Sequence, residues 1–195
     1  DKEGNIWIGT TGGGVNKYNP ITDNFTQYLA NPQAENALPS AIVGALYEDF
    51  RGRIWIGTNN GLSLYRKATN DFVNFQNNPN DPESLPGNTI LAINGDNEGN
   101  LWIGINGVGL VKMDIETKKF YMPNASLNNK LVNNGPINSI DKTPDGFLWL
   151  STANGLAQYR LHDGQIKWYI GADSANSLVN NAVNEISWIN GTKIW

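Results

Sequence analysis

Tryptophan recurs along this chain at an almost constant interval. Trp7, Trp55, Trp102, Trp149 and Trp195 are separated by 48, 47, 47 and 46 residues. A fixed period of this length is typical of repeat architectures, in which each repeat is one small unit that buries its apolar faces only against its neighbours. The period therefore limits the chain to repeat folds, and it indicates that these five tryptophans are structural residues of the repeat.

The first four tryptophans lie in one recurring sequence pattern. An Asp or Thr is followed three positions later by Gly and then by a short apolar segment that contains the Trp, at residues 1–10, 49–58, 96–105 and 143–152. This spacing predicts a tight turn before a strand, because a short polar side chain bonds nearby backbone and Gly accepts a positive φ. The copy that ends at Trp195 lacks both the Asp and the Gly.

Three further short strands are predicted in each repeat. Apolar residues stand 12 and 9 positions before the tryptophan, and a Gly-rich link and two more apolar segments follow it. The positions before the tryptophan are Val43, Leu46, Ile90, Ile93, Ile137, Ile140, Val183 and Ile186, and those of the last strand are Phe25, Tyr28, Phe72, Phe75, Phe120, Pro123, Ile166 and Tyr169. Four short strands joined by turns are typical of one blade of a β-propeller.

The predicted fold is therefore all-β, with about four blades of four antiparallel strands over residues 1–195. Complete blades are predicted at 41–87, 88–134 and 135–180, with a blade that lacks its first strand at 1–40 and the start of a further blade at 181–195, including a strand over 182–187. A closed four-bladed ring would leave the segment around Trp195 surplus. We therefore expect a fragment of a larger, seven-bladed propeller, since propellers have about 4 to 8 blades.

Charge and composition exclude several classes of partner. The net charge is -4 and no Lys/Arg cluster occurs, so the electrostatic footprint that binds nucleic acid or an anionic membrane is absent. The sequence contains no Cys, which excludes disulfides and thiolate metal sites. We expect no nucleic-acid partner, no membrane contact by this segment, no cofactor and no metal.

Candidate catalytic residues are few. The Gly-rich segments at 9–14 and 104–109 lack the Gly-Lys-Ser/Thr ending of a phosphate loop and predict turns. His162 is the only His, and we expect it in a solvated turn without a partner. Most of the acidic residues near the repeat turns are predicted to be structural; they are Glu48, Asp49, Asp96, Glu98 and Asp145. These features predict that the segment is not an enzyme.

Aromatic residues that interrupt the repeat are better candidates for a ligand site. Trp168 stands where the other copies have Gln, Asn and Met, and Trp188 stands where they have Glu, Gly and Lys. Exposed rings are surfaces on which sugars stack, although a contact between domains would use them equally well. Trp168 and Trp188 are therefore predicted to bind ligand, and Tyr47 and Tyr121 are weaker candidates of the same kind.

A longer sequence pattern resembles a known family. The pattern Leu-Pro-x-Asn-x-Ile-x-x-Ile, then Asp-x-x-Gly-Asn-Leu-Trp-Ile-Gly, at residues 85–104, and Gly-Gly-Gly-Val-Asn-x-Tyr-Asn-Pro at residues 12–20, resembles the two-component regulator propeller repeat. In that family the repeats build periplasmic sensor regions of hybrid two-component histidine kinases. The resemblance implies a periplasmic, non-catalytic propeller that binds a glycan-derived oligosaccharide and signals to a kinase outside this segment.

Two other functions stay open from the sequence. Streptogramin lyases are propeller enzymes that resemble this chain in a sequence motif close to Asp-x-x-Gly-x-Ile-Trp, and they use a His as base. A solitary His162 in a turn argues against that function. A scaffold propeller that binds protein is the other. Open blade faces also predict self-association, because unpaired strand edges and uncovered apolar faces invite pairing between chains.

Overall fold

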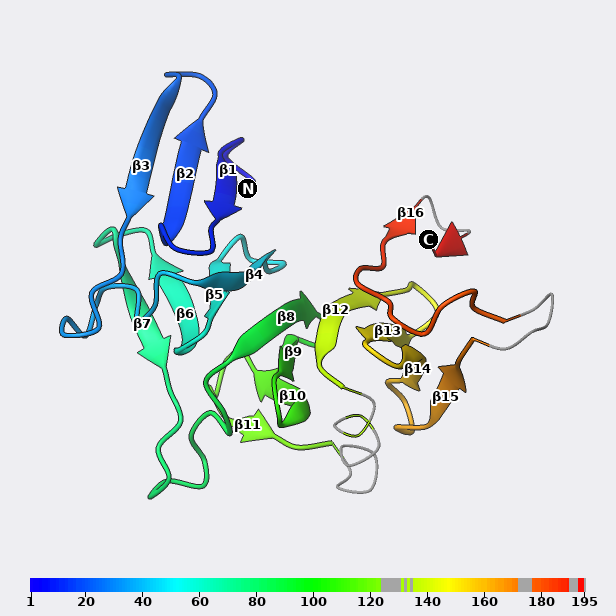
Figure 1. Cartoon of the computed structure of the whole chain (residues 1–195). Coiled ribbons are helices and arrows are strands. Elements are labelled where there is room, and N and C mark those ends of the chain that lie inside the picture. The colour runs from blue at the N-terminus through cyan, green and yellow to red at the C-terminus, as the bar shows by residue number, and fades with distance from the viewer. Residues whose placement is uncertain (124–130, 132, 134, 172–176, 190–192, 195) are drawn as a thin grey trace. The chain divides into compact units, whose positions relative to one another are not determined.

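The computed structural model describes residues 1–123, 131, 133, 135–171, 177–189 and 193–194 (Figure 1). The chain divides into two compact units, residues 1–91 and residues 92–195. Apart from helical residues 131 and 133, the regular elements are β-strands. Every strand pair for which the register is defined runs antiparallel and joins strands that are consecutive in the chain.

The first unit holds two sheets. Their strands are β1 (Ile6–Gly9), β2 (Val15–Asn19) and β3 (Asn24–Tyr28) in one sheet, and β4 (Val43–Glu48), β5 (Ile54–Thr58), β6 (Gly61–Arg66) and β7 (Asp71–Phe75) in the other. Each sheet keeps its strands in chain order, from β1 to β3 and from β4 to β7 (Figure 1). This is the meander that the sequence predicts for a blade.

The second unit repeats the same arrangement. Its first sheet contains β8 (Ile90–Gly95), β9 (Asn100–Ile105), β10 (Gly109–Asp114) and β11 (Phe120–Tyr121), and β8 begins at the end of the first unit. The next sheet contains β12 (Ile137–Lys142), β13 (Phe147–Thr152), β14 (Gly155–Arg160) and β15 (Ile166–Tyr169). A short pair is formed by β16 (Trp188–Ile189) and β17 (Lys193–Ile194). The predicted all-β class with four-stranded antiparallel blades is confirmed.

Two predicted strands differ from the structure. Residues 182–187 form no strand, and their backbone is held instead by single bonds, such as the one that Val183 N–H donates to Thr152 O at 3.0 Å. The last strand of the third sheet, β11, has only two residues. Pro123 follows shortly after it and has no N–H to donate to a ladder, which explains why this strand ends early.

A carboxylate in the turn holds each of the first three repeat tryptophans. The indole Nε1–H donates to Oδ2 of the Asp six residues earlier, at 2.7 Å from Trp7 to Asp1 and at 2.9 Å in the next two copies. The other oxygen of Asp49 accepts the backbone N–H groups of Arg51 and Arg53 at 2.9 and 3.0 Å. One carboxylate therefore closes the turn and fixes the ring of the following strand.

Burial makes this interaction strong. Trp55 is fully buried and Asp49 is 2% exposed. Burial alone would raise the pKa of Asp49, but the donors on Trp55 and Arg53 outweigh it, and the pKa lies below its ordinary value. The fourth copy has Thr143 instead, and its half-buried Trp149 stacks on Tyr169 at 5.3 Å between ring centroids. Trp195 lies outside the described residues.

Aromatic rings join the two sheets of the first unit. Trp7 of β1 stacks on Tyr28 at 5.8 Å and meets the edge of Tyr65 at 4.9 Å, and Tyr28 also meets Phe72 at 5.3 Å. The rings pack around a core that includes Leu38, which is fully buried. Neighbouring blades are therefore held together by apolar contact across their faces.

The Gly of the repeated Trp-Ile-Gly pattern is explained by close approach of the next sheet. A Cβ placed on Gly9 would lie 2.6 Å from Cγ1 of Val43, on β4, and one on Gly104 would lie 3.0 Å from Cβ and O of Ile137, on β12. These distances are below van der Waals contact. Any side chain here would push two blades apart.

We expect Asp49→Ala to lower the free energy of unfolding by about 2 kcal/mol near neutral pH, since it leaves the buried indole N–H of Trp55 without its acceptor. Because the folded-state pKa is lowered, the charged carboxylate stabilises the fold above its unfolded value of 3.8 and loses this effect as the pH falls through the folded value. Urea unfolding near pH 7 and near pH 3 should show the difference shrinking in acid.

The matched control is Asp81→Ala, which removes only an exposed turn bond to the backbone of Glu83 and should change stability by less than about 0.5 kcal/mol. An equal loss for Asp49→Ala at both pH values would contradict a stabilising role of the charge.

We expect Gly9→Ala to destabilise the chain by about 1–3 kcal/mol, because the added methyl group meets Val43 and overpacks the contact between β1 and β4. Gly12→Ala is the control, since no atom lies within 4 Å of its added Cβ. Chemical denaturation measures both. Similar stabilities of the two variants would show that the blades tolerate wider spacing.

Candidate functional site

Two of the four predicted ligand residues, Trp168 and Tyr121, lie on different sheets of the second unit and have different environments. Trp168 lies on β15 opposite Ala157, is half-buried, and packs against the core cluster that includes Trp102 and Tyr159. Tyr121 lies on the short edge strand β11 and is 48% exposed. Tyr121 thus presents a ring to solvent, whereas much of the Trp168 ring is used in packing.

The remaining predicted aromatic residues lie elsewhere. Tyr47 is on β4 in the first unit, half-buried opposite Trp55, and lines a small hollow with Ile6 and Trp7. The backbone of Trp188 begins β16, but its side chain lies outside the described part of the chain. The four candidates therefore come from separate sheets, and their roles in ligand binding stay predictions.

His162 lies in the turn after β14, as the sequence predicts, and is exposed. It lines a hollow of about 440 Å³ together with Arg160 and Asp145. Its imidazole makes no hydrogen bond with the residues that the structure describes. A general base needs such a partner to orient it, so the surroundings of His162 are those of a solvated turn residue.

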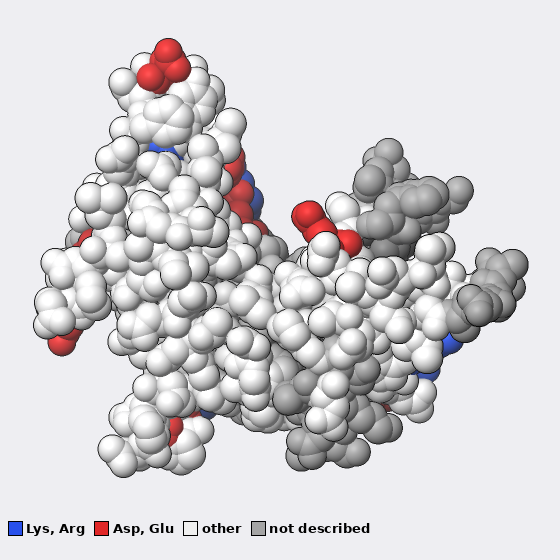
Figure 2. All heavy atoms as spheres, in the orientation of Figure 1, with Lys and Arg blue, Asp and Glu red and all other residues white. Residues whose placement is uncertain are grey.

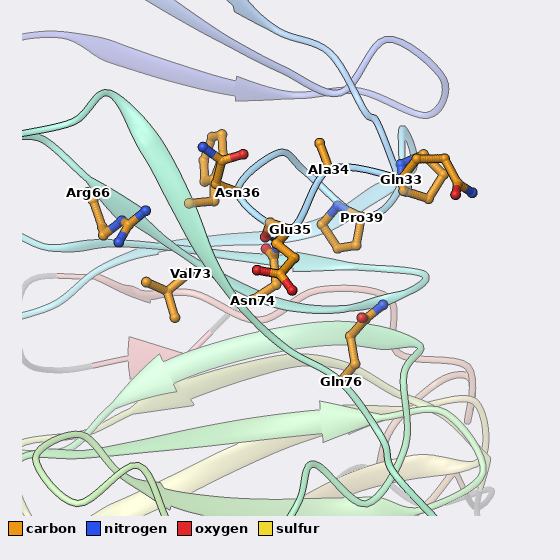
Figure 3. A pocket seen from close by; sticks show the side chains of 11 residues that line it. Gln33, Ala34, Glu35, Asn36, Pro39, Arg66, Val73, Asn74 and Gln76 are labelled. Carbon is orange, nitrogen blue, oxygen red and sulfur yellow. Dashed lines mark hydrogen bonds between the residues drawn. The ribbon is translucent and has the colours of Figure 1, made fainter.

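A polar hollow of about 490 Å³ lies in the first unit, between the segment that joins β3 to β4 and the edge strand β7 (Figure 3). Its side chains extend from Arg66 at one end, past Asn36, Glu35 and Asn74, to Gln33 at the other (Figure 3). The one aromatic residue among its lining, Phe72, is only 3% exposed. This surface can offer hydrogen bonds to a ligand but no aromatic face.

Asn74 positions one wall of the polar hollow. Its Nδ2 donates to the backbone oxygens of Glu35 and Ala37, both at 2.7 Å, while its Oδ1 accepts a bond from Ser63 at 2.6 Å. The backbone N–H of Phe72 donates to Asn36 O at 3.0 Å. The segment before β4 is therefore fastened to β7 by the side-chain amide of Asn74 and by the backbone of Phe72.

An ion pair closes one end of the polar hollow. Arg66 donates to both carboxylate oxygens of Asp71 at 2.7 Å, and Asn36 donates to the same carboxylate at 3.3 Å. The Arg66 guanidinium, followed by the hydroxyl of Thr69, lowers the pKa of Asp71 to about 2. Asp71 therefore stays charged at physiological pH and holds Arg66 in place.

An exposed aromatic hollow lies in the second unit. Tyr121, Met122 and Pro123 line it together with Trp102 and Tyr159, whose ring centroids lie 5.4 Å apart. Its volume is about 190 Å³. It is the place where a sequence-predicted residue, Tyr121, combines exposure with a concave surface.

Neither a metal centre nor a membrane span is found in the described part of the chain. No three His, Cys, Asp or Glu side chains among those residues gather closely enough to hold a metal ion. No helix that they form is long and apolar enough to cross a membrane.

Comparison with known proteins matches the repeat itself. The sequence model of the two-component regulator propeller matches residues 37–60 and 84–107. The two matched segments are similar to this repeat and together make up about a quarter of the chain. Each contains a fully buried leucine, Leu38 or Leu85, followed by the turn Asp and its tryptophan, so the elements that define the repeats are those that build the blade core.

Individual relatives extend the comparison. A histidine kinase, P4, of Formosa agariphila is 36% identical over 55 residues, which are 28% of this chain and 4% of the relative. The extracellular domain of BT4673 of B. thetaiotaomicron, described as a hybrid two-component system, has a TM-score of 0.80 and 23% identity, over 99% of this chain and 25% of that structure. The extracellular domain of BT3049 from the same bacterium has a TM-score of 0.57 and 22% identity, over 94% and 29%. The chain thus spans about a quarter of the solved structures, and the likeness establishes the fold.

The role of Asn74 was not predicted from the sequence. Asn74 occupies the same repeat position as Trp168, with Gln27 and Met122 in the other two copies. This position drew notice only where it carries Trp. The neighbouring segment that Asn74 fastens has no repeat pattern, so its position depends on tertiary contact.

The predicted self-association of the chain also stays a prediction. Strand β1 is an edge strand, and its residue Ile6 is 53% exposed.

We expect Asn74→Ala to release the segment at residues 31–37 and to increase its hydrogen exchange, at a cost in stability of about 1–2 kcal/mol for the lost bonds. Exchange followed by mass spectrometry measures this effect. Gln27→Ala, at the equivalent exposed position of the first sheet, is the control and should leave exchange unchanged. Equal protection in Asn74→Ala would show that the backbone bond suffices.

Proposed function

We propose that this chain is part of a non-catalytic, ligand-sensing propeller of a hybrid two-component receptor, located outside the cytoplasm, whose kinase lies outside this segment. The observation that carries the proposal is the pair of two-component regulator propeller repeats at residues 37–60 and 84–107. Further support comes from the likeness of fold to the extracellular domain of BT4673 and from the local similarity to a histidine kinase.

The proposed ligand is an oligosaccharide released from a glycan. The polar hollow offers amide and carboxylate groups from Gln33, Glu35 and Asn36, and the aromatic hollow offers the exposed ring of Tyr121. Sugars bind through planar hydrogen-bonding groups and through ring faces, so each hollow by itself offers one of these kinds of contact. A lyase is less well supported, because no described residue orients His162 as a base.

Calorimetry on the full-length protein that contains this chain, with a panel of plant and algal oligosaccharides, tests the ligand. We expect one class to bind, and we expect Tyr121→Ala, Trp168→Ala, Trp188→Ala or Tyr47→Ala to weaken it about tenfold, which corresponds to ~1.4 kcal/mol. Phe25→Ala, an exposed ring at a repeat position, is the control. Unchanged affinity in all four variants would exclude these residues, and no binding at all would contradict the glycan ligand.

Signalling is tested separately in the full-length protein. Ligand that binds this region should change the rate at which the kinase autophosphorylates, because a sensor must couple binding to its output. Purified receptor in detergent or nanodiscs, with and without the bound oligosaccharide, provides the measurement. A full-length sequence without any kinase domain would contradict the receptor function.

A further inference from the structure

A charged groove lies between the two sheets of the first unit. Turn residues before β1 and between β4 and β5 form its sides, and side chains from β1, β2 and β6 form its floor; its volume is about 330 Å³. Figure 2 shows basic and acidic side chains next to each other on this flank of the first unit. We propose that the charged groove binds an acidic saccharide, a hexuronate or a sulfated sugar. The proposal rests on the proposed glycan-sensing function and names the ligand class.

Cationic side chains outnumber acidic ones in the charged groove. Its cationic residues are Lys2, Lys17, Arg51, Arg53 and Lys67, and its acidic residues are Asp1, Glu3 and Glu48. The whole chain has 14 Lys and Arg against 18 Asp and Glu. More than a third of the basic residues therefore line one hollow of an acidic chain, and within that hollow the basic side chains outnumber the acidic ones, which favours an anionic ligand.

Three of these cations are exceptions to the repeat, whereas Lys17 has a Lys counterpart in the third copy. Arg51 stands at a position where the other three copies have Glu3, Glu98 and Asp145. Lys67 stands where they have Pro, Ile and Leu, and Arg53 where they have Asn, Asn and Phe. The blade fold does not require a cation at any of these positions, because the other copies form the same sheets without one.

In the corresponding hollow of the second unit, acidic side chains outnumber Lys and Arg. This hollow lies between the equivalent turns of the unit's two sheets, and its volume is about 440 Å³. The acids Asp96, Glu98 and Asp145 line it, with Lys142 and Arg160 as its only Lys and Arg residues among the described lining. The same backbone arrangement thus carries an acidic surface here, so the positive charge belongs to the first groove and not to the fold.

Lys17 is the cation best placed to receive an anion. Arg53 pairs with Asp49 at 2.7 Å, Lys67 pairs with Glu3, and the ammonium group of Lys2 donates to Phe50 O. Lys17 lies instead over the rings of Trp7 and Tyr65, 5.4 and 5.8 Å from their centroids, and makes no ion pair with a described residue.

The aromatic floor explains why a saccharide fits better than a small inorganic anion. Trp7 and Tyr65 meet edge to face, with their centroids 4.9 Å apart, and both are partly buried against the core of the first unit. An apolar sugar face packs against such rings, while its carboxylate or sulfate reaches the Lys17 ammonium. The volume lies near the lower end of ligand sites, which span about 300–1,000 Å³, and suits one or two sugar rings.

Substitutions that restore the residue of another copy test the groove with little risk to folding. Arg51→Glu introduces the acid of the first and third copies, Lys67→Leu the residue of the fourth, and Lys17→Leu the residue of the second. The matched control is Lys167→Leu, because Lys167 lies over the ring of Tyr169 in the second unit at 4.6 Å, as Lys17 lies over Trp7, and lines none of the hollows described above. Urea unfolding of each variant verifies that the fold is retained.

Calorimetry of the full-length protein with trigalacturonate, a sulfated galactotriose and neutral galactotriose measures binding. We expect one of the two acidic probes to bind at least about tenfold more tightly than the neutral one. We expect Lys17→Leu and Arg51→Glu to abolish this preference, while Lys167→Leu retains it. The acidic probe that binds distinguishes a carboxylate from a sulfate ligand.

Other outcomes overturn the proposal in distinguishable ways. If Lys17→Leu and Arg51→Glu bind the acidic saccharide with unchanged affinity, the ligand lies outside the charged groove. The proposed sensor function would then still hold. Preference for neutral galactotriose, or for neutral members of the wider panel, would exclude an acidic ligand and also leave that function standing. Failure of every oligosaccharide to bind would contradict both proposals.

Discussion

The hydrogen bond from a tryptophan indole to a carboxylate in the preceding turn is the interaction on which the rest of this structure depends. Asp49 closes its turn through the backbone of Arg51 and Arg53 and holds Trp55 in the core with its other oxygen. A charged group at this depth is tolerated because the indole of Trp55, two backbone N–H groups and Nε of Arg53 all donate to it. Turn, strand and core are thus coupled through one side chain.

The blade core leaves little freedom at the repeat positions, so functional differences lie where copies differ. The turn before β5 shows this relation clearly. Asp49 is common to three copies and structural, whereas Arg51, two residues later in the same turn, replaces an acid and faces the charged groove. Position 74 behaves similarly, with an amide that fastens a neighbouring segment in one blade and a tryptophan that packs on the core in another.

Much of the fold was predictable because its signals are local. Turn residues, alternating apolar positions and the tryptophan period lie within about 47 residues of one another, and they placed strands such as β5 and β9 correctly. The errors occurred where a strand needs a partner that the local pattern does not supply. Residues 182–187 have the apolar spacing of a first strand but no ladder, and β11 stops before Pro123.

By itself the sequence determined the repeat and the four-stranded blade, because both depend on contacts between residues close in the chain. Only the tertiary structure decided which side chains share a surface. Glu3, Arg51 and Lys67 are far apart in sequence and meet in one groove because the two sheets pack face to face. Packing also turned Trp168 toward the core and left Tyr121 exposed, since burial depends on the neighbouring sheets rather than on residue type.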